Sequence, residues 1–154
     1  MTISFTASPA ASAGADVTLC ANNANVSLNG SVTLATGGVW SGGTGTFVPS
    51  NTAMNATYSP SAAELSNGTL TLVLTTTGNG TCNAVSDQVL WTITPAPTAN
   101  AGSDQTLCAN NAVATLSGSY TVATGGVWSG GAGSFSPSTA NMNATYTPTA
   151  TEIA

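Results

Sequence analysis

Few side chains in this chain could carry out chemistry. Of its 154 residues, five are Asp or Glu, three are Cys, and none is Lys, Arg or His. Thiols form disulfides or hold metals, and paired carboxylates hydrolyse glycosidic bonds. The missing cations and imidazoles exclude Schiff bases, Lys-containing phosphate loops, catalytic triads and His-based zinc sites. We therefore expect no enzymatic activity, and no binding to nucleic-acid phosphates.

Two of the carboxylates fit a structural role. Ser61 and Glu64 have the spacing of a capping box, and Thr149 and Glu152 repeat it. No spacing argument brings Glu64 and Asp87 together as a hydrolytic pair. We expect Glu64 and Glu152 to cap a short helical turn.

An internal repeat organises the chain. AGADVTLCANNA begins at Ala13 and AGSDQTLCANNA begins at Ala101, an offset of 88 that holds without a gap. Of the 54 positions in 13–66, 35 are identical in 101–154. Self-similarity at a fixed period marks a tandem repeat protein.

The same offset aligns TISFT at the N-terminus with LWTIT in the first unit. We expect residues 1–9 to be the last strand of a preceding repeat plus a linker, and 10–95 to be one complete repeat. Residues 96–154 are then the first part of a second, truncated repeat, and the chain is a window from a longer array. In an alternative, the N-terminal strand completes the unfinished unit of a neighbouring chain by strand donation.

Strand patterns dominate each unit. Hydrophobic residues alternate through 70–75 and again through 89–94, and the Gly-Asn-Gly turn at 78–80 joins these runs into a long hairpin. Shorter strand patterns precede the hairpin, at 17–19, 25–28, 37–40, 45–47 and 55–58. Seven short strands in about 85 residues predict an all-β fold, an antiparallel Ig-like β-sandwich in tandem repeats.

The cysteines follow the repeat. Cys20 and Cys82 lie in the complete unit, Cys108 matches Cys20, and the match to Cys82 would fall beyond Ala154. We predict a Cys20–Cys82 disulfide, with Cys108 left unpaired by the truncation. Closing a loop of about 60 residues contributes about 4 kcal/mol on the chain-entropy model, and a disulfide indicates an oxidising, extracytoplasmic setting. The alternative is two buried free thiols.

Three tryptophans invite two interpretations. Trp40 and Trp128 lie in the repeated motif GGVWSGG, and Trp91 lies in the last strand pattern. We interpret all three as core aromatic residues of a sandwich. In the alternative, Trp40 and Trp128 are exposed platforms that stack on sugar rings.

Three aspartates are weak calcium candidates. Asp16 and Asp104 each follow a Pro-containing junction, and Asp87 could add a ligand. Calcium takes six to eight oxygen ligands, so we expect these residues to cap turns instead and predict no cofactor. Six Asn-x-Ser/Thr sequons occur without further support for glycosylation, at Asn25, Asn29, Asn55, Asn67, Asn79 and Asn143.

Several motifs resemble those of a known family. PTANAGSDQTLCANN, GGVWSGGAGSFSPS, NMNATYTPTATE and GNGTCNAVSDQ are similar to the PKD-like and Ig-like repeats of very large Bacteroidota surface proteins. These include gliding-motility adhesins of the SprB type and other type IX-secreted proteins. The resemblance implies a PKD-like β-sandwich at the surface of a Gram-negative cell, with structural spacing or adhesion as its role. It supplies no ligand-binding residue.

These observations lead to a structural hypothesis. The linkers at 94–97 and 7–9 are short and contain Pro, so they should hold neighbouring units semi-rigidly. Stacked units would then form an extracellular stalk, filament or adhesin, with neighbouring repeats or identical chains as partners. No apolar run is long enough for membrane insertion.

The alternative function is a module that binds carbohydrate, such as surface polysaccharide, or another cell through exposed Trp or Tyr. Ice binding through Thr arrays such as TLTLVLTTT is a weaker alternative, since each unit has one such run.

Overall fold

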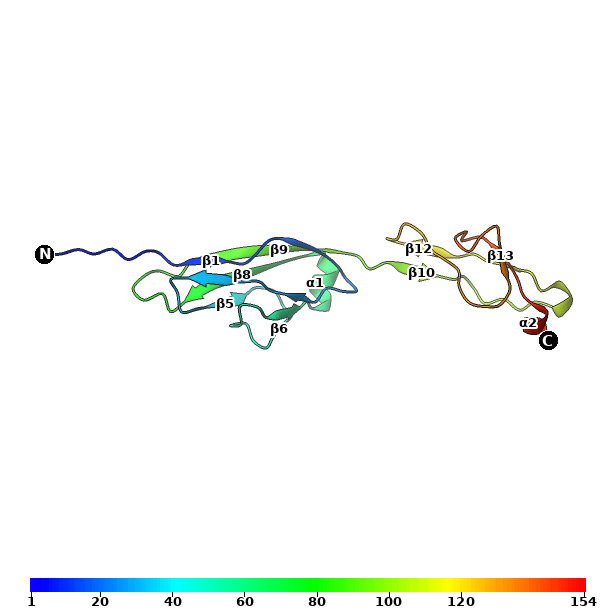
Figure 1. Ribbon diagram of the computed structural model, residues 1–154, viewed down its shortest axis with the longest axis horizontal. Coiled ribbons are helices and arrows are strands. Elements are labelled where there is room, and N and C mark those ends of the chain that lie inside the picture. The colour runs from blue at the N-terminus through cyan, green and yellow to red at the C-terminus, as the bar shows by residue number, and fades with distance from the viewer. The chain divides into compact units, whose positions relative to one another are not determined.

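The structure is a computed structural model that describes all residues, 1–154, and they form two compact units, Met1–Ala96 and Pro97–Ala154. Figure 1 shows strands and short loops throughout, with one short α-helix in each unit. The fold is all-β, as the sequence predicts.

The first unit contains nine strands and one helix. In chain order these are β1 (Ala10–Ser12), β2 (Val17–Cys20), β3 (Val26–Ser27), β4 (Ser31–Thr33), β5 (Gly37–Ser41), β6 (Thr46–Val48), β7 (Thr57–Ser59), α1 (Ala62–Asn67), β8 (Thr69–Thr77) and β9 (Ser86–Thr94). The seven strands expected from sequence are all present. Strands β1 and β4 were not expected, because each has only three residues, too few for an alternating pattern to identify a strand.

Three sheets build this unit. The largest has the order β2-β9-β8-β5, the second has the order β3-β7-β6, and β1 pairs with β4. The pairs are antiparallel except for β2 and β9, which run parallel with Cys20 opposite Thr94. The sandwich is therefore mixed at one edge, where a fully antiparallel arrangement was expected.

The core lies against one face of the β8–β9 hairpin. Side chains alternate between the two faces of a strand, and alternate residues of both strands are buried while their neighbours are exposed. The buried hydrophobic cluster consists of Ala13, Leu28, Trp40, Ala56, Tyr58, Leu70, Leu72, Leu74, Val89, Trp91 and Ile93. Ala11 of β1 and Val32 of β4 are partly buried and pack against this cluster, so all three sheets contribute to a single core.

The second unit repeats two of these three sheets. Its elements are β10 (Thr98–Asn100), the 3₁₀ turn η1 (Ala109–Asn111), β11 (Ala114–Thr115), β12 (Ser119–Thr121), β13 (Ser134–Ser136), β14 (Thr145–Thr147) and α2 (Ala150–Ile153). The sheets β10-β12 and β11-β14-β13 match β1-β4 and β3-β7-β6 in order and direction.

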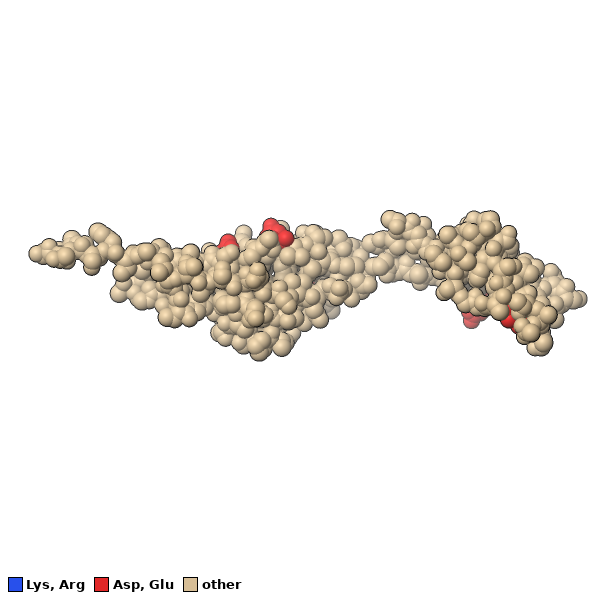
Figure 2. Space-filling model, viewed as in Figure 1, with Lys and Arg blue, Asp and Glu red and all other residues tan.

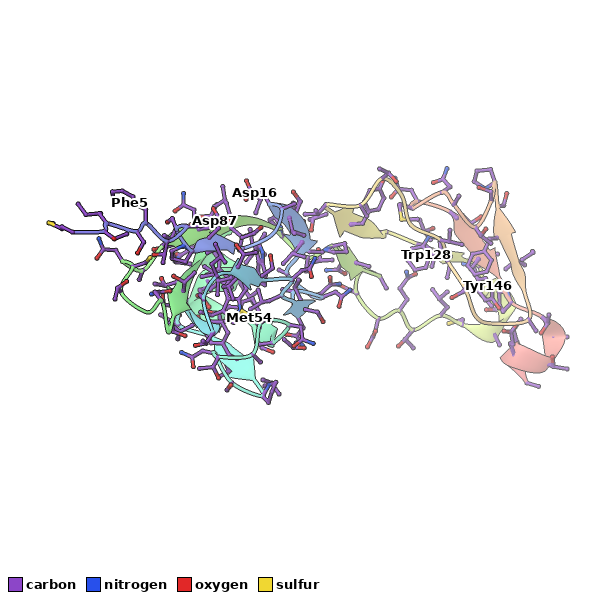
Figure 3. The ribbon with its side chains drawn as sticks, turned by 60° about the vertical axis from the view of Figure 1, so that its left-hand side comes forward. Phe5, Asp16, Met54, Asp87, Trp128 and Tyr146 are labelled. Atoms are coloured by element: carbon purple, nitrogen blue, oxygen red, sulfur yellow. The ribbon has the colours of Figure 1, made fainter.

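The segments of the second unit that match β2 and β5 form no strands. In the first unit β2 pairs with β9 and β5 pairs with β8, and the given sequence contains no second copy of that hairpin. The N-terminal segment that matches β9 is also without strand structure, and its Ile3 and Phe5 are exposed (Figure 3).

Candidate functional site

The first unit has two ends, each marked by a cysteine that lies close to a linker residue. We call Thr6, Ala7 and the turn 78–85 the arrival end, because the Cys82 sulfur lies 3.6 Å from Thr6 Oγ1 and 3.9 Å from the Ala7 carbonyl oxygen. We call Cys20, Thr94 and Pro95 the departure end. There the Cys20 sulfur lies 3.8 Å from the Pro95 carbonyl oxygen.

The β8–β9 hairpin separates these two ends (Figure 1). Strand β9 has nine residues, and the eight steps between them, at about 3.3 Å each, span roughly 26 Å. It begins beside the turn of the arrival end and finishes at Thr94, opposite Cys20. The chain therefore enters the unit at one end and leaves it at the other.

The predicted Cys20–Cys82 disulfide is wrong. Cys20, Cys82 and Cys108 are all free thiols, the first two half-buried and the third exposed. A disulfide joins Cα atoms less than about 7 Å apart, whereas Cys20 and Cys82 lie at opposite ends of β9. The prediction failed because the number of residues between two cysteines does not show whether they lie at the same end of a unit or at opposite ends of a long hairpin.

A buried phenol and carboxylate lie together beside α1. The Tyr58 hydroxyl donates to Glu64 Oε1 at 2.9 Å, and the same oxygen accepts from the backbone N–H of Thr44 at 2.7 Å. Glu64 Oε2 accepts from the backbone N–H of Ser61 at 2.7 Å, which completes the capping box expected from sequence. Both Tyr58 and Glu64 are buried.

Opposing effects act on the acidity of this pair. Burial raises the pKa of the Glu64 carboxyl, but the hydrogen bonds from Ser61, Thr44 and Tyr58 outweigh it, so the pKa is lowered from its ordinary value. Burial, aided by the bond to Glu64, raises the pKa of Tyr58 to about 12. At neutral pH the pair is a carboxylate that accepts from a neutral phenol, which gives it no proton to exchange near pH 7.

The glycine-rich loop after Trp40 packs closely against the Tyr58 hydroxyl. The backbone N–H of Gly45 donates to the Tyr58 hydroxyl at 2.7 Å. A Cβ at Gly43 would collide with the Tyr58 hydroxyl, and Gly43 also has a φ of +70°. Side chains are excluded at this position by both space and backbone conformation.

The second unit contains the same cluster in exposed form. Tyr146 donates to Glu152 Oε1 at 2.6 Å, and the Gly133 N–H donates to the Tyr146 hydroxyl at 2.8 Å. Hydrogen bonds from Tyr146, Thr149 and Ala132 lower the pKa of Glu152 to about 2. The cluster is therefore a property of the repeat and needs no burial to form.

Sequence reasoning missed the partnership of Tyr58 and Glu64. It assigned Glu64 to the cap alone and included Tyr58 only in the strand pattern at 55–58. A signal was available, because a Tyr and a Glu six residues apart recur in both units at the offset of 88. The recurrence of a buried polar pair within one repeat indicates that the two side chains are partners.

The tryptophans of the first unit are internal. Trp40 and Trp91 have 0% and 1% of their surface exposed, and the Trp91 ring meets Tyr58 edge-on with centroids 5.8 Å apart. Neither can serve as a sugar platform in this unit. Trp128 is half-buried, and its indole N–H donates to the Asn141 carbonyl oxygen (Figure 3).

The aspartates accept backbone hydrogen bonds. Asp87 Oδ2 accepts from the Ala13 N–H at 2.8 Å, and Asp16 Oδ1 accepts from the Leu90 N–H at 2.9 Å. These bonds attach the loop between β1 and β2 to β9 (Figure 3). Asp104 is exposed, and no group of three Asp, Glu, Cys or His side chains lies close enough together to hold a metal ion.

Comparisons with known proteins identify no family. No protein-family model matches the sequence, and neither does any curated protein. One structural resemblance is to "Protocadherin Gamma B2 extracellular cadherin domains 3-6", with a TM-score of 0.43 and 13% sequence identity over 92% of this chain. The chain spans 39% of the length of that one. The sheets described above, rather than this likeness, define the fold. None of the helices has the length and apolar character needed to cross a membrane.

Proposed function

We propose that this chain is part of an extracellular stalk or filament built from tandem β-sandwich repeats. One observation carries the proposal: the first unit receives the chain at its arrival end and releases it at its departure end. Units connected in this way add length with every repeat. A fold with both termini at one end would instead place its neighbours side by side.

The linkers favour a semi-rigid array. Ala7, Ser8 and Pro9 lead into β1, and Pro95, Ala96 and Pro97 lead into β10. Proline fixes φ near −65° and favours extended backbone. Linkers of this length and composition allow little folding back, which suits a projecting stalk.

The surface suits exposure outside a cell. Figure 2 shows scattered acidic side chains and no basic ones, in agreement with a composition of five Asp and Glu and no Lys or Arg. A chain without Lys or Arg has no site for trypsin-like proteases. A surface of hydroxyl and amide groups also lets units pack side by side without charge repulsion.

The resemblance in sequence motifs extends the proposal to a specific setting. Repeats similar to those of Bacteroidota surface adhesins would be secreted, would lie at the surface of a Gram-negative cell, and would bind neighbouring repeats or identical chains. Their role would be mechanical and non-enzymatic. Adhesion itself would then belong to other parts of the array.

Electron microscopy tests the proposal. Chains with several successive units should form extended particles, with one sandwich-sized bead for every 88 residues. Flexible, collapsed coils would contradict a stalk. Trp128, which is half-buried, gives an additional readout, because a carbohydrate-binding module that used it would change its fluorescence on addition of glycans.

A further inference from the structure

The two half-buried thiols of the first unit contact equivalent positions of the repeat. Cys82 lies 3.9 Å from the carbonyl oxygen of Ala7, and Cys20 lies 3.8 Å from the carbonyl oxygen of Pro95. Ala7 and Pro95 are 88 residues apart, which is the repeat offset. The linker before the unit and the linker after it are thus each contacted by a cysteine sulfur at the equivalent backbone carbonyl oxygen.

A linker between two complete units would be contacted from both sides. The preceding unit would present its Cys20 position at its departure end, and the following unit would present its Cys82 position at its arrival end. Each sulfur would lie within about 4 Å of one shared carbonyl oxygen, so the two sulfurs would lie no more than about 8 Å apart. Rotation of the two side chains would then have to bring them to the S–S bond length of about 2 Å.

We propose that successive units are joined by a disulfide between the Cys20 position of one unit and the Cys82 position of the next. This inference rests on the tandem array of the proposed function and on the geometry of the first unit. Every complete unit supplies one thiol of each kind, so each linker within an array has a matched pair.

The bond forms by thiol–disulfide exchange. The oxidant is a compound that itself contains a disulfide, and a thiolate of the pair attacks it and releases one thiol. The second thiolate of the pair then attacks the mixed disulfide and releases the other thiol. The pair loses two electrons and two protons, and the oxidant becomes two thiols.

Such a bond would change how an array carries load. Tension along the backbone passes through the linker Pro95–Pro97, which lies between β9 and β10. A disulfide across it provides a second covalent path between the units. It also limits their rotation, which hydrogen bonds across a short linker do not.

A lengthened chain tests the pairing. The full chain is extended at Ala154 with a second copy of residues 67–96, which supplies counterparts of β8, the turn and β9 in the second unit. The purified protein is treated with oxidised glutathione and denatured without reductant. Its free thiols are then alkylated and counted by intact mass.

The proposal predicts that two of the four thiols of this extended chain are protected. Cys82→Ser and Cys108→Ser should both retain the bond, whereas Cys20→Ser should abolish it. The substitution of Ser for Cys in the added copy of Cys82 should abolish it as well. Tryptophan emission of each variant, compared with the parent, shows whether the first unit is folded.

Two results would overturn the proposal. One is four free thiols in the folded, oxidised chain. The other is a bond that Cys82→Ser abolishes, which would mean pairing within the first unit. A second measurement needs no added segment: in natural secreted protein, non-reducing peptide maps should join TCNAVSDQ to a peptide other than the one that contains Cys20.

Discussion

The Tyr58 hydroxyl donates to Glu64 Oε1 at 2.9 Å inside the first unit, and Tyr146 makes the same bond to Glu152 at 2.6 Å in the second. The pair joins strand β7 to the first turn of α1, and its counterpart joins β14 to α2. The same hydrogen bonds from Tyr to Glu and from Gly to Tyr occur in both units. Loss of the pair should therefore affect stability without affecting any binding site.

Tyr58→Phe should destabilise the first unit. The substitution leaves a buried carboxylate without one donor and the Gly45 N–H without its acceptor, at a cost of about 1–3 kcal/mol. Urea denaturation followed by Trp fluorescence measures the change. Tyr120→Phe is the matched control, because Tyr120 is 39% exposed and its loss of a hydroxyl should change stability little. Equal effects of the two substitutions would contradict a structural role for the pair.

The dependence of stability on pH should show a wide plateau. The lowered pKa of Glu64 gives stability that is present above the unfolded value of about 4.3 and is lost as the pH falls through the folded value. The raised pKa of Tyr58, about 12, gives stability that is present below pH ~10 and is lost as the pH rises toward 12.

The chain has no His, so no side chain with an ordinary pKa near neutrality adds a transition between these limits. Melting temperatures measured from pH 3 to 11 should be constant from about pH 5.5 to 8 and should fall on the acid side and above pH 10. Tyr58→Phe should reduce the alkaline fall. A maximum near pH 7 with slopes on both sides would contradict this assignment.

Gly43→Ala should destabilise the first unit by at least about 2 kcal/mol, because the new methyl group collides with the Tyr58 hydroxyl and the backbone has a positive φ. Gly80→Ala is the control: Gly80 also has a positive φ, of +62°, but nothing lies within 4 Å of its Cβ position. It should cost only the backbone strain of about 1 kcal/mol. Thermal melts of both variants separate steric exclusion from backbone strain, and a similar loss in both would show that the contact is unimportant.

Calcium should leave the melting temperature unchanged. Asp16 and Asp87 each accept a backbone hydrogen bond and are not part of a larger group of ligands. Asp87→Ala should cost about 1 kcal/mol through loss of the bond from Ala13, whereas Asp104→Ala, at an exposed position, should cost little. A rise in melting temperature with calcium that disappears in Asp87→Ala would instead establish a metal site.

Sequence patterns predicted the elements that depend on local periodicity. The alternation in β8 and β9 is long and regular, so it identified the hairpin and its buried face. Strands β1 and β4 have three residues each and weak patterns, and they form because they pair with each other. The parallel pairing of β2 with β9 is a matter of topology, which periodicity does not encode.

The cysteine prediction failed for a different reason. The spacing of Cys20 and Cys82 in sequence gives the size of a loop but not the direction in which each thiol lies. Because β9 separates them by its whole length, they cannot form a disulfide with each other. The contact between Tyr58 and Glu64 was missed because a capping box already accounted for Glu64 and a strand pattern already accounted for Tyr58. The recurrence of both residues, six positions apart, in the second unit was the signal that they are partners.

The central claim is that the chain enters the first unit at one end and leaves it at the other. The distance between the native thiols of Cys20 and Cys82 tests this claim directly. Nitroxide labels on Cys20 and Cys82, with Cys108→Ser to remove the third thiol, allow the distance between the labels to be determined by double electron–electron resonance. The account predicts a single narrow distribution near the length of β9, roughly 26 Å or more. A distance below about 10 Å, close to the reach of a disulfide, would place both thiols at one end and contradict the account.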